Sequence, residues 1–340
     1  MKNEIYIVTG ANGHLGKIIV KNLLSKNCEV RGLVLNGEEH EVLKGVEYFY
    51  GDVRDRNSLE PMFLTDQEIY LIHTAAIVDI SEVISTKVYD VNVNGTKNII
   101  ELCRKYYVKR LLHVSSVHAI PEIEDVGIIS EITSFHSDEV IGGYAKTKAE
   151  ASQLVLDAVN AGLDAVIVHP SGIIGPYDDQ NSNHLVQMIS DCIEGKTPAL
   201  VDGGYDFVDV RDVAIGCLLA LEKGKEGECY ILSNRHYQVW ELLRMISSVV
   251  KIRKLPVLPI SVAECIVPFF GCYAKMTRRR PLFTKYSLHT LKAKYYFSHD
   301  KATSELGFRP RDIKETMIDT AEWIISNKEE PSKANNFRVN

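Results

Sequence analysis

Residues 5–24, IYIVTGANGHLGKIIVKNLL, join a run of β-branched residues to a helical pattern through a turn that contains three glycines. Gly10, Gly13 and Gly16 directly follow the expected strand Ile5–Val8. A helix start presents amide donors and a positive dipole end, and glycine lets the backbone approach a phosphate closely. The stretch therefore predicts a dinucleotide-binding loop, and a plain tight turn is the alternative. The predicted cofactor-binding residues of this loop are Gly10, Asn12, Gly13, His14, Leu15 and Gly16.

The alternation of strand and helix continues to about residue 170. Short β-branched runs predict strands at 5–8, 29–35, 46–50, 69–73, 110–114 and 165–169. Helical patterns fall at 16–26, 58–63, 88–107 and 144–161. Strands that alternate with helices form a parallel sheet covered on both faces, so the expected fold class is α/β, a Rossmann-type doubly wound parallel sheet.

Beyond residue 170 prolines recur and the pattern becomes mixed, which indicates a smaller C-terminal substrate-binding lobe. The expected domains are an NAD(P)-binding domain over 1–170, with contributions returning from about 205–235, and a mainly substrate-binding lobe over 171–327. The polar segment 328–340 is expected to fray. Residues 255–291 are apolar and aromatic with interspersed prolines, which fits either buried core or a lid over an apolar pocket.

Composition narrows the function classes. The chain has 340 residues, of which 45% are hydrophobic and 25% charged, as in an ordinary globular protein. A net charge of −6 disfavours nucleic acid as a partner and leaves a small molecule. Seven scattered cysteines without a Cys-x-x-Cys pair favour buried thiols over a metal site or disulfides. With no leader pattern and no apolar run long enough to span a bilayer, the expected location is cytoplasmic.

The end of the second strand usually distinguishes NAD from NADP, because an acidic residue there accepts hydrogen bonds from the ribose and a basic one favours a 2′-phosphate. This chain has Leu35 and Asn36 at that point, and both are predicted to line the cofactor. Glu38 and Glu39 come a few residues after the position where such an acidic residue usually stands. The sequence therefore leaves NAD and NADP both open.

Tyr144 is the only one of sixteen tyrosines with a lysine four residues later, Lys148. Residues four apart share a helix face, so the ammonium can lie beside the phenol and the cofactor ribose. A nearby cation lowers the pKa of a phenol, which suits proton exchange with a hydroxyl or carbonyl. An ordinary exposed helix face would have the same pattern.

Ser115 and Ser116 end the strand RLLHVSS, at the sheet edge where ligands bind in this architecture. A hydroxyl there can hydrogen-bond the substrate oxygen on which the tyrosine acts. A helix or turn cap is the alternative role.

With these residues assembled, the chain resembles the extended short-chain dehydrogenase/reductase superfamily over nearly its whole length. It looks most like the 3β-hydroxysteroid dehydrogenase and dihydroflavonol reductase group. The matching segments, in order, are TGANGHLG, GDVRD, HTAA, VNVNGTKNI, VSS, YAKTK, HPSGIIGP and FVDVRDVA.

The resemblance implies roles for the matching positions. Tyr144 would be the general acid/base, Lys148 would orient the nicotinamide ribose, and Ser116, with Ser115 close behind, would bind the substrate oxygen. Asn92 would position a helix near the lysine. The remaining cofactor contacts implied by the resemblance are Asp52 and Val53 at the adenine, Thr74, Ala75 and Ala76 at the pyrophosphate and ribose, and Pro170 and Ser171 at the nicotinamide.

Departures from the pattern bear on the substrate. Nucleotide-sugar members carry an arginine before the FVDVRD segment, where this chain has Tyr205 and Asp206, and a carboxylate is a poor clamp for a diphosphate. His169 stands where arginine is common.

Three hypotheses follow. The first is an NAD(P)-dependent oxidoreductase that acts on a hydrophobic secondary alcohol or ketone, steroid-like or flavonoid-like. The alternatives are a nucleotide-sugar epimerase/dehydratase that retains its NAD, and a non-catalytic dinucleotide sensor. The resemblance also implies a homodimer formed through the helices at 88–107 and 144–161.

Overall fold

The computed structural model describes residues 3–79, 84–122, 127–180, 182–265, 285–292 and 295–335. The chain divides into two compact units. The first comprises Met1–Ser171, Arg211–Ser233 and Lys294–Arg309, and the second comprises Gly172–Val210, Asn234–Ala293 and Pro310–Asn340. The independence of these units as domains stays a prediction.

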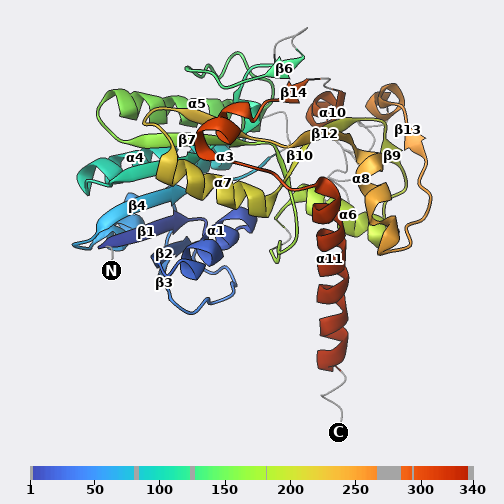
Figure 1. Cartoon of the computed structure of the whole chain (residues 1–340), viewed down its shortest axis with the longest axis horizontal. Coiled ribbons are helices and arrows are strands. Elements are labelled where there is room, and N and C mark those ends of the chain that lie inside the picture. The colour runs from blue at the N-terminus through green and yellow to red at the C-terminus, as the bar shows by residue number, and fades with distance from the viewer. Residues whose placement is uncertain are drawn as a thin grey trace. The chain divides into compact units, whose positions relative to one another are not determined.

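The first unit is built on a seven-stranded sheet whose neighbouring strands are all parallel (Figure 1). The strand order is β11-β7-β5-β4-β1-β2-β3. This arrangement confirms the Rossmann-type doubly wound fold. The strands are β1 (Glu4–Thr9), β2 (Glu29–Val34), β3 (Val46–Tyr50), β4 (Glu68–His73), β5 (Arg110–Val114), β7 (Ala165–Pro170) and β11 (Cys229–Leu232).

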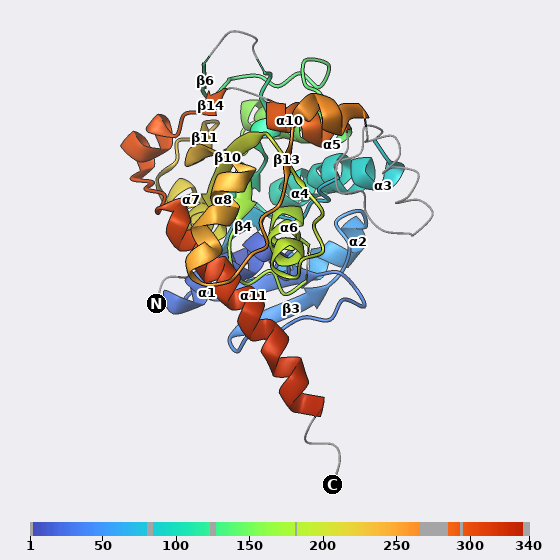
Figure 2. The same cartoon turned by 90° about the vertical axis from the view of Figure 1, so that its right-hand side faces the viewer.

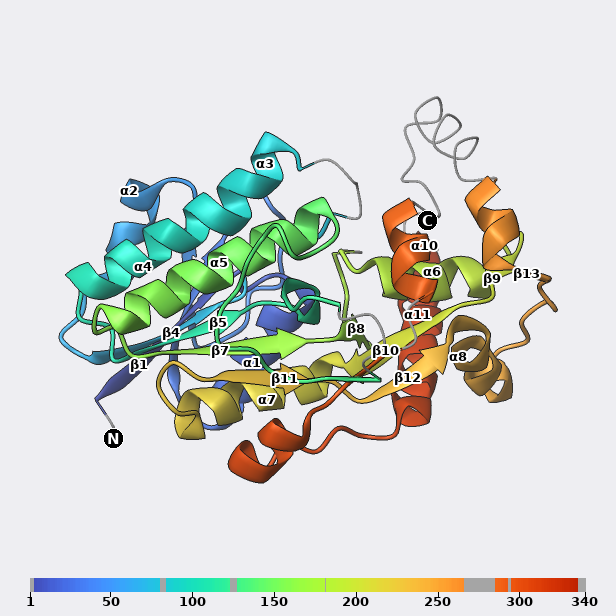
Figure 3. The same cartoon turned by 90° about the horizontal axis from the view of Figure 1, so that it is seen from above.

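Helices cover both faces of this sheet (Figure 3). On one face lie α4 (Gly95–Lys105) and α5 (Gly143–Asn160), and on the other lie α1 (His14–Ser25) and α7 (Val210–Lys223). The interior strand β7 is buried along its whole length, as its unbroken AVIVHP run requires when both faces are covered. A two-stranded pair, β6 (Ile128–Ile129) with β14 (Tyr296–Phe297), and the π turn η5 (Ala302–Leu306) complete the unit.

Two predicted helices are interrupted. The expected helix at 58–63 is α2 (Arg56–Leu59) followed by a 3-10 turn, η1 (Glu60–Phe63), because Pro61 lacks the amide that an α-helix would use. The expected helix at 88–107 is α3 (Thr86–Tyr89), a π turn η2 (Asp90–Asn94) and then α4. π turns often mark functional sites, and this one holds Asn92.

The second unit contains a three-stranded sheet of β8 (Gly172–Ile174), β10 (Gly204–Asp209) and β12 (Arg235–Gln238). A parallel pair joins β9 (Leu200–Val201) to β13 (Val257–Leu258). In Figure 2 the long helix α11 leads to the C-terminus. The helices of this unit are α6 (His184–Ile193), α8 (Val239–Met245) with the 3-10 turn η4 (Ile246–Ser248), α10 (Lys285–Lys292) and α11 (Ile313–Asn335).

Two expectations fall partly on this unit. Of the apolar segment 255–291, residues 266–284 lie outside the described residues, and the flanking Ala263 and Leu288 form a core cluster with Val201. The tail expected to fray from 328 is instead helical to Asn335. Lys328 contacts Ser190 of α6 and Glu194, the residue that caps the end of α6.

Among the described residues, no helix combines the length and apolar character needed to cross a membrane.

Candidate active site

The predicted cofactor residues gather at one edge of the first unit. Strands β1 and β4 are neighbours in the sheet, and the strand order proceeds in opposite directions on their two sides. In doubly wound sheets ligands bind at the carboxyl ends of the strands at such a switch point. The glycine turn follows β1, Leu35 and Asn36 follow β2, Asp52 and Val53 follow β3, and Thr74, Ala75 and Ala76 follow β4.

The glycine turn is tightly constrained. Gly10 has a φ of 66°, and a Cβ there would lie 3.0 Å from the backbone of Ala75. A Cβ on Gly16 would overlap the Gly10 carbonyl oxygen. Gly13 caps α1 with no side chain, and the first turn of the helix carries no acidic residue. A turn without side chains at the positive end of a helix fits a dinucleotide diphosphate.

A buried polar chain holds this turn against the next strands. Thr74 Oγ1 donates to Thr9 O at 2.6 Å, and Thr9 Oγ1 lies 2.8 Å from His73 Nδ1. His73 Nε2 in turn lies 3.1 Å from Thr96 Oγ1, which donates to Asn92 O. Thr74 thus supports the glycine turn, a role that only the pairing of β1 with β4 reveals.

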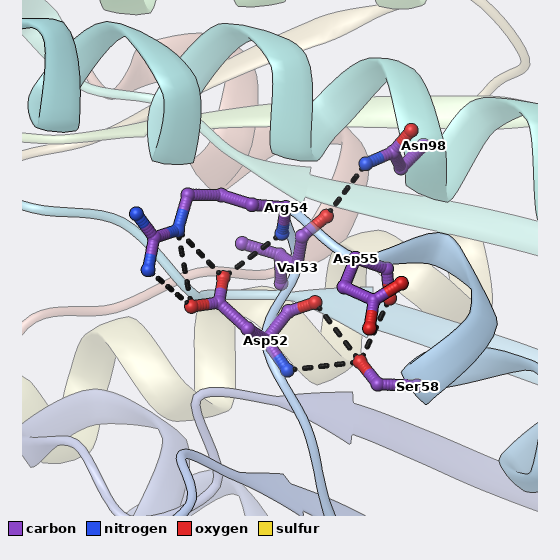
Figure 4. A network of polar contacts seen from close by, with 6 residues as sticks. All are labelled: Asp52, Val53, Arg54, Asp55, Ser58 and Asn98. Carbon is purple, nitrogen blue, oxygen red and sulfur yellow. Dashed lines mark hydrogen bonds and ion pairs between the residues drawn. The ribbon is translucent and has the colours of Figure 1, made fainter.

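Asp52 and Val53, which are predicted to lie at the adenine, belong to a network of polar contacts after β3 (Figure 4). Both carboxylate oxygens of Asp52 accept hydrogen bonds from the Arg54 guanidinium, at 2.6–3.0 Å. Val53 is buried, and Asn98 Nδ2 donates to its carbonyl at 2.9 Å. An open recess of about 440 Å³ lies here, lined by Asp52, Arg54, Asp55, Asp90 and Asn94.

Tyr144 lies in the first turn of α5, after Gly142, whose φ of 100° favours glycine. The Tyr144 side chain is partly exposed and lies near the Ser116 side chain. Desolvation raises the pKa of the phenol to about 12, and the nearby Ser116 hydroxyl acts in the lowering direction. At neutral pH the phenol is therefore protonated.

Lys148 is almost fully buried and donates to the carbonyl of Val114, at the end of β5, at 2.6 Å. Desolvation lowers the pKa of Lys148 to about 7. The sequence predicts that Lys148 lowers the pKa of Tyr144, but in this structure burial of the phenol dominates and raises the pKa of Tyr144. The tyrosine and lysine share a helix, but Lys148 binds the strand backbone.

The two serines face different partners. Ser116 is extended, and its Oγ accepts a hydrogen bond from His118 N at 3.3 Å on the side of Tyr144, whereas Ser115 Oγ lies 2.6 Å from Ser152 Oγ, which donates to Lys148 O. Successive residues of extended backbone point to opposite sides, so only one of the pair can reach the phenol. Ser115 links β5 to α5, and the role of Ser116 as the substrate-binding hydroxyl stays a prediction.

Asn92 is buried in the π turn, and its amide has three partners. Its Oδ1 accepts from Ile77 N at 2.8 Å, and its Nδ2 donates to Ile77 O and to Thr147 Oγ1. Thr147 Oγ1 donates to Tyr144 O. Asn92 thus ties the segment after β4 to the turn of α5 that carries the tyrosine.

Two histidines near Tyr144 or Ser116 were not predicted as site residues. The His118 ring lies edge-on to Tyr144, with centroids 6.2 Å apart, and burial lowers its pKa to about 4. His169 Nδ1 lies 2.9 Å from Ser116 O, and burial lowers its pKa to about 4 as well. His118 follows Ser116 by two residues, but spacing alone could not show its contact with a helix that begins at residue 143.

The remaining predicted residues lie at the end of β7 and in the second unit. Pro170 ends β7, and Ser171 N donates to Leu232 O at 3.2 Å. Asp206 is buried on β10, where its Oδ1 accepts from Asn234 N at 3.0 Å. This carboxylate therefore has a structural partner within its own unit.

A switch-point glycine turn and a tyrosine, serine and lysine on neighbouring elements define a dinucleotide-dependent oxidoreductase of the doubly wound class. The model of the NAD dependent epimerase/dehydratase family matches residues 6–239. The chain belongs to this family, within the extended short-chain dehydrogenases/reductases, and is an NAD(P)-dependent enzyme.

Individual relatives cover nearly the whole chain. Sterol demethylase protein B of Methylococcus capsulatus is 32% identical over 94% of this chain and 97% of that protein. A putative dihydroflavonol 4-reductase of Synechocystis is 30% identical, over 94% of each chain. The crystal structure of gox2253 superposes with a TM-score of 0.81, at 31% identity over 95% of this chain and 98% of that one.

Proposed function

We propose that the protein interconverts a secondary alcohol and a ketone on a hydrophobic substrate of the steroid or flavonoid type, with NAD(P) as the redox partner. The observation that carries this proposal is that the Ser116 side chain lies near enough to the Tyr144 phenol to influence its pKa, so that both hydroxyls can reach a single substrate oxygen. The names of the relatives, a sterol demethylase component and a dihydroflavonol reductase, support this substrate class.

The side chains divide the proton chemistry between them. In the reductive direction the protonated Tyr144 hydroxyl donates its proton to the carbonyl oxygen, and in the oxidative direction it takes the proton back. Ser116 hydrogen-bonds the same oxygen and stabilises its developing negative charge. The bound dinucleotide supplies or accepts the hydride at its nicotinamide ring.

Supporting residues hold this pair in place. Asn92 fixes the first turn of α5 through Thr147, and His169 holds the Ser116 backbone from β7. The glycine turn would hold the diphosphate, and Asp52 with Val53 would face the adenine. The buried Lys148, near the end of β5, would orient the nicotinamide ribose. Asp206, at the position of the diphosphate clamp in nucleotide-sugar members, disfavours a sugar nucleotide as substrate.

The test measures the absorbance of reduced nicotinamide with hydroxysteroids, dihydroflavonols and sugar nucleotides as substrates. We expect net cofactor turnover with an apolar alcohol or ketone. Tyr144→Phe should lower kcat by about 10²–10⁴-fold, and Tyr107→Phe, at an exposed tyrosine, should not change it.

Wild-type turnover in Tyr144→Phe would refute the mechanism. Conversion of a sugar nucleotide without net cofactor change would replace the proposal with an epimerase/dehydratase. Cofactor binding without turnover on any of the three substrate classes would point to a sensor.

A further inference from the structure

The segment between β2 and β3, residues 35–45, faces the part of the site where the adenosine ribose binds in doubly wound folds. It carries three glutamates, Glu38, Glu39 and Glu41. NADP differs from NAD only by a phosphate on that ribose, which adds about two negative charges at neutral pH. The charge of this segment therefore bears directly on cofactor choice.

Contacts with the glycine turn and with β3 hold the segment in place. Asn12 Nδ2 donates to Glu39 O at 3.4 Å. The His40 ring lies against Tyr48 and Tyr50 of β3, with centroids 4.7 and 5.7 Å apart. The Tyr48 hydroxyl donates to Glu41 O at 3.2 Å. These contacts hold the backbone of the three glutamates beside the glycine turn.

Three cations near the glycine turn and the end of β3 are paired with carboxylates. Lys17, in the first turn of α1, lies 2.6 Å from Glu41 Oε2, and Lys21 lies 3.4 Å from the same oxygen. Arg54 is held by both oxygens of Asp52. Lys44 precedes the amino end of β3 and so lies toward the opposite edge of the sheet.

We propose that the Glu41–Lys17 ion pair makes the dinucleotide site selective for NAD over NADP. A 2′-phosphate could recruit Lys17 only by displacing Glu41, and without that displacement it would meet the carboxylates of the segment unpaired. Neutral ribose hydroxyls bring no such repulsion. Glu41 follows the usual position of the selecting acid by several residues, and it acts by holding the lysine that a phosphate would need.

Calorimetric titration with NAD⁺ and with NADP⁺ tests this proposal through binding alone, without any substrate. We expect wild-type protein to bind NAD⁺ at least about tenfold more tightly. Glu41→Gln should remove the carboxylate that pairs with Lys17 and narrow that ratio at least about threefold, through stronger NADP⁺ binding. The matched control is Glu47→Gln. It removes the same charge from Glu47 of β3, whose Oε2 lies 2.8 Å from Nε of Arg31 on β2.

A salt series keeps the test decisive even if Glu41→Gln does not fold. Because the discrimination is electrostatic, raising the salt to about 0.5 M should reduce the wild-type ratio. Equal or tighter NADP⁺ binding by the wild type would overturn the proposal. So would a ratio that salt leaves unchanged, or one that Glu47→Gln narrows as much as Glu41→Gln. Since substrates play no part, none of these results bears on the proposed alcohol–ketone chemistry.

Discussion

Replacing Lys148 by methionine should stabilise the protein in the absence of cofactor while removing its activity. The side chain is almost fully buried, and desolvation lowers its pKa to about 7 from an ordinary value of 10.5. Burial of Lys148 with this lowered pKa therefore reduces the free energy of unfolding at pH 7 by about 5 kcal/mol. Losing the hydrogen bond to Val114 O costs about 2 kcal/mol, so a net gain of about 3 kcal/mol is expected at pH 7.

The pH dependence distinguishes this cause from simple repacking. Between about pH 7 and 10.5 the unfolded chain holds a proton on Lys148 that the native protein does not. Wild-type stability therefore gains from this group as pH rises through that window, by about 1.4 kcal/mol per unit. The gap between Lys148→Met and wild type should shrink accordingly and be close to zero near pH 9.

Urea unfolding followed by circular dichroism at several pH values between about 6 and 9 measures this gap. Lys146→Met is the matched control, because Lys146 lies on the same helix but is partly exposed. A Lys148→Met protein that is less stable than wild type at pH 7, or a gap that does not depend on pH, would show that burial of the ammonium is not costly here.

Two further predictions concern the glycine turn and the buried histidines. Gly16→Ala places a Cβ on the Gly10 carbonyl oxygen, so it should lower the free energy of unfolding by about 2 kcal/mol and abolish NAD binding. The control Gly127→Ala, whose Cβ would have no atom within 4 Å, should do neither. Thermal melting with and without NAD measures both effects, and NAD binding by Gly16→Ala would contradict the role of the glycine turn. Burial lowers the pKa of His169 to about 4, so native protein binds fewer protons than unfolded chain between about pH 4 and 6.5, and stability is lost as pH falls through that window. His169→Asn keeps a donor for Ser116 O, and between pH 7 and pH 5 its free energy of unfolding should fall by about 2 kcal/mol less than that of the wild type. Urea unfolding measures this difference, and an equal fall in both proteins would refute the effect of His169 burial on stability.

Much of the fold follows from local pattern. The predicted strands at 5–8, 46–50 and 110–114 coincide with β1, β3 and β5 to within a residue or two, because buried parallel strands leave short β-branched runs in the sequence. Helix interruptions were not predicted. Pro61 and the π turn at Asp90–Asn94 change the hydrogen-bond register without altering the apolar pattern.

Site residues could be predicted by type and by strand end, but their partners could not. Ser115 and Ser116 are equivalent by spacing, and only the direction of the extended backbone sends Ser116 to Tyr144 and Ser115 to Ser152. The effect of Lys148 on the phenol was misjudged for the same reason. Helical spacing brings the two side chains to one face, but burial and the carbonyl at the end of β5 set both pKa values.

Short-range spacing was thus enough to predict a tight glycine turn, a doubly wound sheet and a helix that carries both Tyr144 and Lys148, since backbone conformation and side-chain period are local properties. Cofactor selectivity and proton affinity depend on groups distant in the chain. Lys17 meets Glu41 across a whole strand, and Ser116 meets Tyr144 across a long loop. Such pairs exist only after the sheet has assembled, because electrostatic and desolvation energies depend on distance and burial in space.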